Sequence, residues 1–245
     1  MRSLLRVGLA VLLAAALYGA PGKVSKEKIK VDGKSRDYYL YVPEKLPESG
    51  KAPVLMLLHD RQKDGSSLIG PWTRMAAREG IILVAPNSQG KMGWTAPLDG
   101  PGFLYEILEA LKKTHPVDPR RVYLFGHADG AVFGMFVSFW ASEYFAAASA
   151  HAGTFREEAE ARMAERAKRK IPIQLIVGTD DRHYPVGLFE VNAEFLKFSE
   201  FEIDLQVVPD HKHDYAPAAE TINPIVWEFL SGKALDGEPR YESPF

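Results

Sequence analysis

Short apolar runs alternate with helical segments along most of this chain, and this alternation constrains the fold most strongly. Four runs of strand length are mostly apolar: P-V-L-M-L-L-H (53–59), I-I-L-V-A-P (81–86), R-V-Y-L-F (121–125) and I-Q-L-I-V (173–177). Near-continuous hydrophobic strands are typical of parallel sheets that are buried on both faces. The chain is therefore predicted to be α/β, with a mostly parallel sheet covered by helices on both faces.

The other segments fit this architecture. K-I-K-V and D-Y-Y-L-Y-V flank an Asp-Gly turn, which predicts an antiparallel hairpin at the N-terminal end of the fold. The short stretches F-A-A-A-S-A and I-D-L-Q-V-V are predicted to be further strands. Helices are predicted over 68–79, 103–113, 131–141, 155–170, 187–200 and 216–230.

Length and composition indicate one globular domain. The 245 residues are 46% hydrophobic and carry a formal net charge of −2 without a basic block, so nothing suggests a nucleic acid partner. The chain has no cysteine, which excludes disulfides, thiolate metal sites and cysteine nucleophiles. The domain is predicted over 23–232, with a loosely held tail over 233–245. The oligomeric state is not indicated.

The first 22 residues have the layout of a secretory signal peptide. Arg2 and Arg6 precede a short apolar run over 7–17, and small residues follow it. The run is too short to span a bilayer comfortably, although an uncleaved anchor or a buried first helix stays an alternative. We expect a secreted or periplasmic bacterial protein, without a stable membrane anchor once the leader is cleaved.

The stretch L-F-G-H-A-D-G-A (124–131) joins a predicted buried strand to a nearly all-apolar helix. Gly126 and Gly130 frame the turn as in the Gly-x-Ser-x-Gly nucleophile elbow of serine hydrolases, but Ala128 stands where the serine would be. Polar segments follow two later strands, G-T-D-D-R-H-Y-P and P-D-H-K-H-D-Y. The chain order is therefore that of nucleophile, acid and histidine in α/β-hydrolases.

Together with P-V-L-M-L-L-H, W-T-R-M-A-A-R-E-G-I-I-L-V-A-P-N and V-D-P-R-R-V-Y-L-F-G-H, these blocks resemble the α/β-hydrolase superfamily. They are most similar to its polyhydroxybutyrate-depolymerase, feruloyl-esterase and small carboxylesterase branch, over about 35–230. The resemblance implies hydrolysis of a small-molecule or polymer ester through an acyl-enzyme, without a cofactor.

The resemblance also implies roles for individual residues. Asp181 matches the acid of the triad, and His213 matches its histidine. The backbone N–H groups of Asp129 and Arg61 match the oxyanion hole. His127, His151 and Trp94 are candidates for substrate contact.

Two departures fall on this machinery. Ala128 replaces the serine, and Asp60 replaces the usual glycine after His59 in the oxyanion loop. Because loss of a serine nucleophile costs on the order of 10⁶ in turnover, the chain is expected to be nearly inactive by this mechanism. Three interpretations of Ala128 stay open: an engineered substitution, a natural pseudoenzyme that binds without cleaving, and a different reaction carried by the remaining His and Asp residues.

Metal-assisted hydrolysis is a further, weaker alternative. His211 and His213 alternate in D-H-K-H-D with flanking carboxylates, but zinc requires three or four converging ligands and no further spaced cluster accompanies them. The prediction is therefore that no metal binds, and that His183 and His211 lie at the rim of the site.

Overall fold

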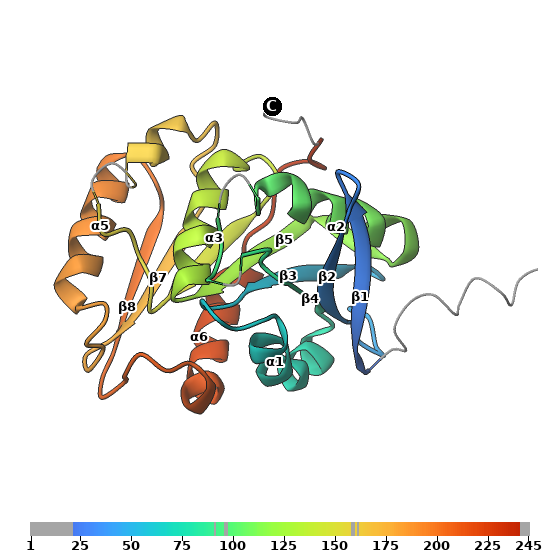
Figure 1. Ribbon diagram of the computed structural model, residues 1–245, viewed down its shortest axis with the longest axis horizontal. Coiled ribbons are helices and arrows are strands. Elements are labelled where there is room, and N and C mark those ends of the chain that lie inside the picture. The colour runs from blue at the N-terminus through green and yellow to red at the C-terminus, as the bar shows by residue number, and fades with distance from the viewer. Residues whose placement is uncertain (1–21, 91, 96–97, 158–159, 161, 241–245) are drawn as a thin grey trace, which may run out of the picture.

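The computed structural model describes residues 22–90, 92–95, 98–157, 160 and 162–240. An eight-stranded sheet runs through the centre in the order β1-β2-β4-β3-β5-β6-β7-β8 (Figure 1). This confirms the predicted fold class of a mostly parallel α/β sheet with an N-terminal antiparallel hairpin. The strands are β1 (Val24–Val31), β2 (Lys34–Tyr41), β3 (Ala52–Leu58), β4 (Ile82–Pro86), β5 (Val117–His127), β6 (Ala147–His151), β7 (Ile173–Gly178) and β8 (Ile203–Val208).

The topology places one end of the sheet in position for a site. Strands β3 to β8 pair in parallel, whereas β2 pairs antiparallel with both β1 and β4. The chain passes from β3 outward to β4 on one side, and β5 then returns to the other side of β3. Such a reversal opens a crevice at the carboxyl ends of the strands, where ligands bind in open α/β sheets.

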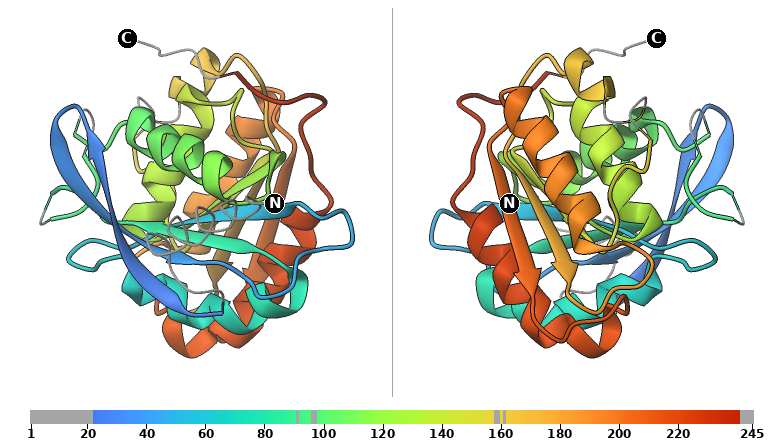
Figure 2. Two further views of the ribbon diagram at one scale, coloured as in Figure 1. Left: turned by 90° about the vertical axis from the view of Figure 1, so that its right-hand side faces the viewer. Right: turned by 90° about the vertical axis from the view of Figure 1, so that its left-hand side faces the viewer.

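The helices among the described residues cover the sheet in two layers (Figure 2). α1 and α6 pack on one face, and their apolar side chains share one core cluster with alternate residues of the central strands. α2, α3 and α5 cover the other face around a larger core. The bounds are α1 (Ser66–Glu79), α2 (Pro101–Thr114), α3 (Asp129–Trp140), α5 (Val186–Phe198) and α6 (Ala219–Ser231).

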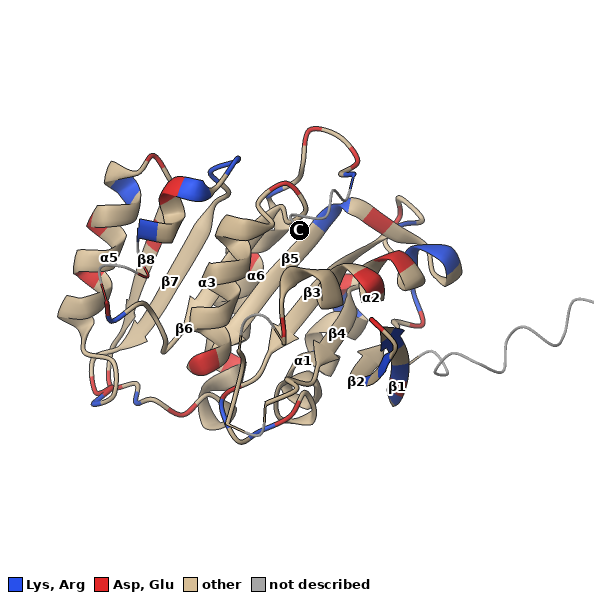
Figure 3. Cartoon of the chain, turned by 45° about the horizontal axis from the view of Figure 1, so that its top comes forward, with Lys and Arg blue, Asp and Glu red and all other residues tan. Residues whose placement is uncertain are grey.

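Charge is distributed as this layering requires. Lys, Arg, Asp and Glu lie on β1, on the outer helices and in loops, while α3 carries a charge only at its first residue (Figure 3). α3 is nearly all apolar because it lies between the sheet and the rest of the larger core.

The prediction of a long charged helix over 155–170 was wrong. Residues 155–157 and 167–170 lie outside any helix, and Arg162–Arg166 forms a short 3₁₀ helix. Side chains in this segment bind backbone groups: Glu160 Oε2 accepts the N–H groups of Arg156 and Glu157, and Lys170 Nζ donates to the Ala164 carbonyl. The Lys170 contact uses a carbonyl that a continuous helix would pair with the backbone N–H four residues on.

The sequence predicts a signal peptide at the N-terminus and a loosely held tail at the C-terminus. The predicted signal peptide falls outside the described residues except for Gly22. Within the described part, no helix has the length and apolar character needed to cross a membrane. The expectation of a loose tail does not fit residues 233–235, because buried Leu235 exchanges two hydrogen bonds with Arg120 and the Lys233 carbonyl accepts the Tyr123 hydroxyl.

Candidate active site

The turn from β5 into α3 is a tight elbow centred on Ala128. Ala128 has φ 51° and ψ −112°, a backbone conformation that is rare for a residue with a side chain. Close packing imposes it: a Cβ atom on Gly126 would lie 2.2 Å from the Gly130 carbonyl oxygen, and one on Gly130 would lie 2.0 Å from that of Leu58. The strained geometry that exposes a nucleophile in serine hydrolases is therefore present here without an oxygen at its apex.

His213 and Asp181 are brought together from the loops after β8 and β7. His213 Nδ1 lies 2.9 Å from Asp181 Oδ2. The other carboxylate oxygen accepts the N–H groups of His183 and Tyr184 at 2.8 and 2.9 Å, and the Asp181 side chain is fully buried. The carboxylate thus holds the half-buried His213 ring with Nε2 left over for another partner. The catalytic roles assigned to this pair stay predictions.

The two backbone N–H groups expected to form the oxyanion hole converge on one atom. The N–H of Arg61 donates to Asp60 Oδ1 at 2.7 Å, and the N–H of Asp129 donates to the same oxygen at 3.2 Å. A side-chain carboxylate therefore occupies the point where the predicted oxyanion hole would hold a substrate oxygen. Its negative charge would oppose an oxyanion at this point.

The Asp60 contact was not foreseen from the sequence, where the replaced glycine raised only the question of whether the loop keeps its shape. The available signal was the residue type. Asp side chains readily accept hydrogen bonds from nearby backbone N–H groups, so an Asp beside an oxyanion hole can fill it.

Trp94 connects the loop after β4 to the loop after β3 and to α3. Its indole Nε1–H donates to the His59 carbonyl at 2.7 Å, and its ring stacks on Phe133 with centroids 4.6 Å apart. Its own backbone N–H donates to Asp129 Oδ2. With 9% of its surface exposed, Trp94 acts as packing in this structure, which does not fit the substrate-contact role predicted for it.

Three histidines form a chain behind the elbow. His127 Nδ1 and His151 Nδ1 are 3.1 Å apart, and His151 Nε2 and His211 Nε2 are 2.8 Å apart. His151 is fully buried in the middle and cannot contact a ligand, which corrects its predicted role, and His211 is buried rather than at the rim. His183 is exposed, as expected of a rim residue.

Burial keeps the His127 and His151 rings uncharged near neutral pH. Burial lowers the pKa of His127 to about 4, and it lowers the pKa of His151 well below the ordinary value for histidine. The row of three histidines could have been predicted from the sequence. His127 and His151 end the neighbouring strands β5 and β6, and His211 follows β8.

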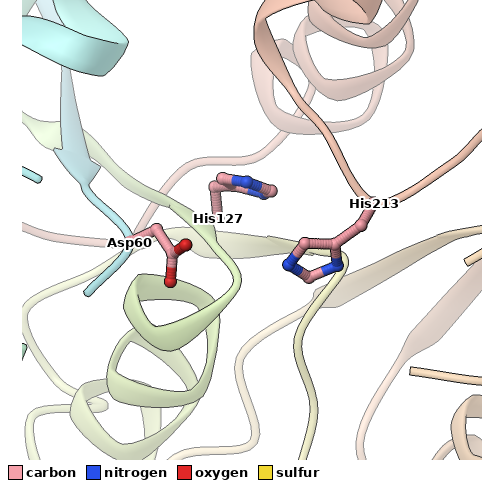
Figure 4. Close-up of side chains that lie close together, drawn as sticks. All are labelled: Asp60, His127 and His213. Carbon is pink, nitrogen blue, oxygen red and sulfur yellow. The ribbon is translucent and has the colours of Figure 1, made fainter. Parts of the chain in front are cut away.

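Asp60, His127 and His213 surround a common space in front of the elbow (Figure 4). One carboxylate oxygen and one nitrogen from each imidazole lie within 4.8 Å of one another. Among the described residues, this is the set of side chains that could hold a metal ion. The D-H-K-H-D segment itself does not converge, since His211 points to His151 and His213 points to Asp181.

Comparison with known proteins supports an esterase relationship. No family model matches the chain. It is 27% identical to a bifunctional acetylxylan esterase/xylanase of Neocallimastix patriciarum over 154 residues, which cover 61% of this chain but only 22% of that protein.

Solved structures share the fold at low identity. A thermostable esterase has a TM-score of 0.68 at 19% identity, covering 86% of this chain and 63% of that one. A ferulic acid esterase has a TM-score of 0.63 at 18% identity, with 85% and 97% covered. An S-formylglutathione hydrolase from Agrobacterium tumefaciens has a TM-score of 0.66 at 18% identity, with 85% and 94% covered. These likenesses establish the α/β-hydrolase fold.

Proposed function

We propose that this chain is a carboxylic-ester-hydrolase scaffold that binds an ester ligand but does not cleave it through an acyl-enzyme. One observation carries the proposal. Ala128 offers no nucleophilic oxygen at the apex of the elbow, and Asp60 Oδ1 takes up both N–H groups that would stabilise the tetrahedral intermediate. Two separate requirements of the acyl-enzyme reaction are therefore unmet.

The two losses have large and separable magnitudes. Removal of the serine costs on the order of 10⁶ in turnover. Loss of a single oxyanion-hole donor costs about 10²–10³, and here both donors are engaged by a carboxylate. Restoring serine alone therefore leaves the reaction without its oxyanion hole.

Asp60 also bears on the origin of Ala128. A substitution made only to trap a substrate would leave the oxyanion hole open, whereas here Asp60 fills it. This supports natural loss of the acyl-enzyme reaction over an engineered alanine. The ligand class is supported by the acetylxylan esterase relative. Secretion is proposed from the leader pattern of residues 1–22.

The test is hydrolysis of p-nitrophenyl acetate by four proteins: the chain as given, Ala128→Ser, Asp60→Gly and the double variant. We expect background rates from the first three and a rise of at least about 10²-fold over Ala128→Ser in the double variant. Asp181→Asn added to the double variant is the control, because a triad mechanism requires that carboxylate.

Two outcomes would contradict the proposal. Turnover by the unaltered chain at the rate of an ordinary esterase, about 10 s⁻¹, would show that it does not need the missing groups. Full activity of Ala128→Ser alone would show that Asp60 does not block the hole.

Binding without turnover is tested separately by calorimetry with acetylated xylo-oligosaccharides, using the deacetylated oligosaccharides as the control. Binding that requires the acetyl group supports an ester-binding pseudoenzyme. Absence of binding at millimolar ligand would remove this part of the proposal.

A further inference from the structure

We propose that Asp60, His127 and His213 form a binding site for a divalent transition metal of the Zn²⁺ type, in the space in front of Ala128. The three residues come from the loop after β3, the end of β5 and the loop after β8 (Figure 4). Their candidate ligand atoms lie within 4.8 Å of one another.

The donor set fits this class of metal. Two imidazole nitrogens and one carboxylate oxygen are a ligand combination of Zn²⁺ sites that keep a fourth position open, whereas Ca²⁺ and Mg²⁺ prefer oxygen ligands throughout. Three protein ligands would leave a fourth coordination position open. A water molecule or a ligand oxygen could occupy it.

Each of the three side chains is already oriented by a second contact that leaves one atom free. Asp60 Oδ1 accepts two backbone N–H groups, so Oδ2 remains. His213 Nδ1 contacts the buried Asp181 carboxylate, so Nε2 remains. His127 Nδ1 contacts His151, so again Nε2 remains.

This pattern of second contacts is what metal-binding residues require. A metal-binding histidine almost always donates its other ring N–H to a carboxylate, a carbonyl or another acceptor, and this contact fixes its tautomer. The contact of His213 with Asp181 is of the carboxylate–histidine type found at zinc sites. The same contact is used in a hydrolase triad, so His213 and Asp181 alone do not distinguish the two uses. His127 and Asp60, in contrast, have no place in a triad.

The histidine chain provides the tautomer that His127 needs. If His127 donates Nδ1–H to His151 Nδ1, then His151 must carry its proton on Nε2 and donate it to His211 Nε2. In this arrangement His127 Nε2 bears a lone pair directed away from His151. A metal ion on Nε2 would select this arrangement over the reverse one, in which His127 Nε2 carries the proton.

Binding requires a small closure of the site. Ligand atoms of a tetrahedral zinc site lie about 3.3 Å apart when the bonds are about 2.0–2.1 Å long, so the longest separation must shorten by roughly 1.5 Å. Arg61 and Gln62, which follow Asp60, are exposed, and His213 is half-buried. Asp60 and His213 can therefore shift without disturbing the core, while His127 stays fixed at the end of β5.

The experiment titrates the full-length protein, freed of metal with EDTA and dialysed, with Zn²⁺ in a calorimeter and with Co²⁺ in a spectrophotometer. We expect one ion per chain, and Co²⁺ absorption bands with the intensity of a four- or five-coordinate ion. Asp60→Asn and His213→Gln should each weaken binding at least 100-fold. Asp181→Asn should weaken it about 10–100-fold, because it removes an orienting contact.

The matched control is His183→Gln. His183 is exposed, and its ring lies 4.7 Å from that of His213, but it belongs to no part of the set. Affinity should be unchanged in this variant. Circular dichroism and urea unfolding of every variant would show that loss of binding is not loss of folding.

Absence of one-to-one binding by the unaltered protein would overturn the proposal, as would unchanged affinity in Asp60→Asn and His213→Gln. His127 is buried, so substitution there can unfold the protein. X-ray absorption of the Zn²⁺ form of the unaltered protein replaces that variant: two imidazoles in the shell support the site, and a shell without imidazole refutes it. Because no ester is used, these results are independent of the hydrolysis test.

Discussion

The close approach of α3 to the sheet can be tested by the same substitution at two glycines one turn apart. In Gly130→Ala the new Cβ atom would lie 2.0 Å from the Leu58 carbonyl oxygen and 2.6 Å from that of His59. Both are backbone atoms that cannot rotate away. In Gly134→Ala the nearest atom is Leu58 Cδ1 at 3.2 Å, the end of a flexible side chain.

The expected magnitudes follow from these contacts. An alanine inside a helix is favoured over glycine by up to about 1 kcal/mol, so Gly134→Ala should leave the free energy of unfolding unchanged or raise it by that amount. Forcing extra atoms into a packed interior costs about 1–3 kcal/mol and occasionally more, and a 2.0 Å approach to backbone lies at the severe end. Gly130→Ala should therefore lower the free energy of unfolding by at least about 2 kcal/mol.

The assay is urea unfolding followed by circular dichroism at fixed pH. For an m-value of about 2 kcal/mol per M, the urea midpoint of Gly130→Ala should fall by about 1 M. The midpoint of Gly134→Ala should stay or rise. If the two variants unfold within about 0.5 kcal/mol of each other, the close packing of the elbow is not a constraint and the account of the strained turn is wrong.

Two further predictions concern stability. Arg36→Met should lower the free energy of unfolding by about 3–5 kcal/mol, because it leaves the fully buried Asp99 carboxylate without its cation. Lys26→Met removes only a surface ion pair, so its urea midpoint should stay close to that of the unaltered protein. Equal urea midpoints for the two variants would refute this. The pKa of His127 is lowered to about 4 by burial and that of His151 is lowered as well, so the unfolded chain binds more protons than the folded one below about pH 6.5. Stability measured in EDTA should therefore fall as the pH drops from 6.5 towards 4, and an unchanged urea midpoint over this range would contradict the buried neutral state.

Most of the fold could be predicted because strands of a buried parallel sheet are visible in the sequence as continuous apolar runs. A strand covered on both faces needs apolar side chains throughout, and β3 is buried at every position. The prediction of a helix over 155–170 failed for the opposite reason. Its charged residues suit a helix surface, but whether they bind solvent or nearby backbone groups depends on contacts such as that of Arg156 with the His183 carbonyl.

The site was predictable only in outline. Loop positions after successive strands indicated which residues approach the elbow, and His213 and Asp181 do lie in contact. Side-chain directions were not predictable, because they depend on pairings across strands. His151 ends β6 as His127 ends β5, yet its ring lies between His127 and His211 instead of pointing towards a ligand. The contact of Asp60 with both N–H groups could likewise not be predicted, because it depends on the conformation of the loop.

The carboxylate at the elbow has a consequence for how such a chain can evolve. A lineage that regained serine at 128 would still lack an open oxyanion hole, and one that regained glycine at 60 would still lack a nucleophile. Each single reversion would yield little activity for selection to favour. If the chain lost an acyl-enzyme reaction as proposed, that reaction would return only through two changes together, and Asp60 could meanwhile be selected for another task.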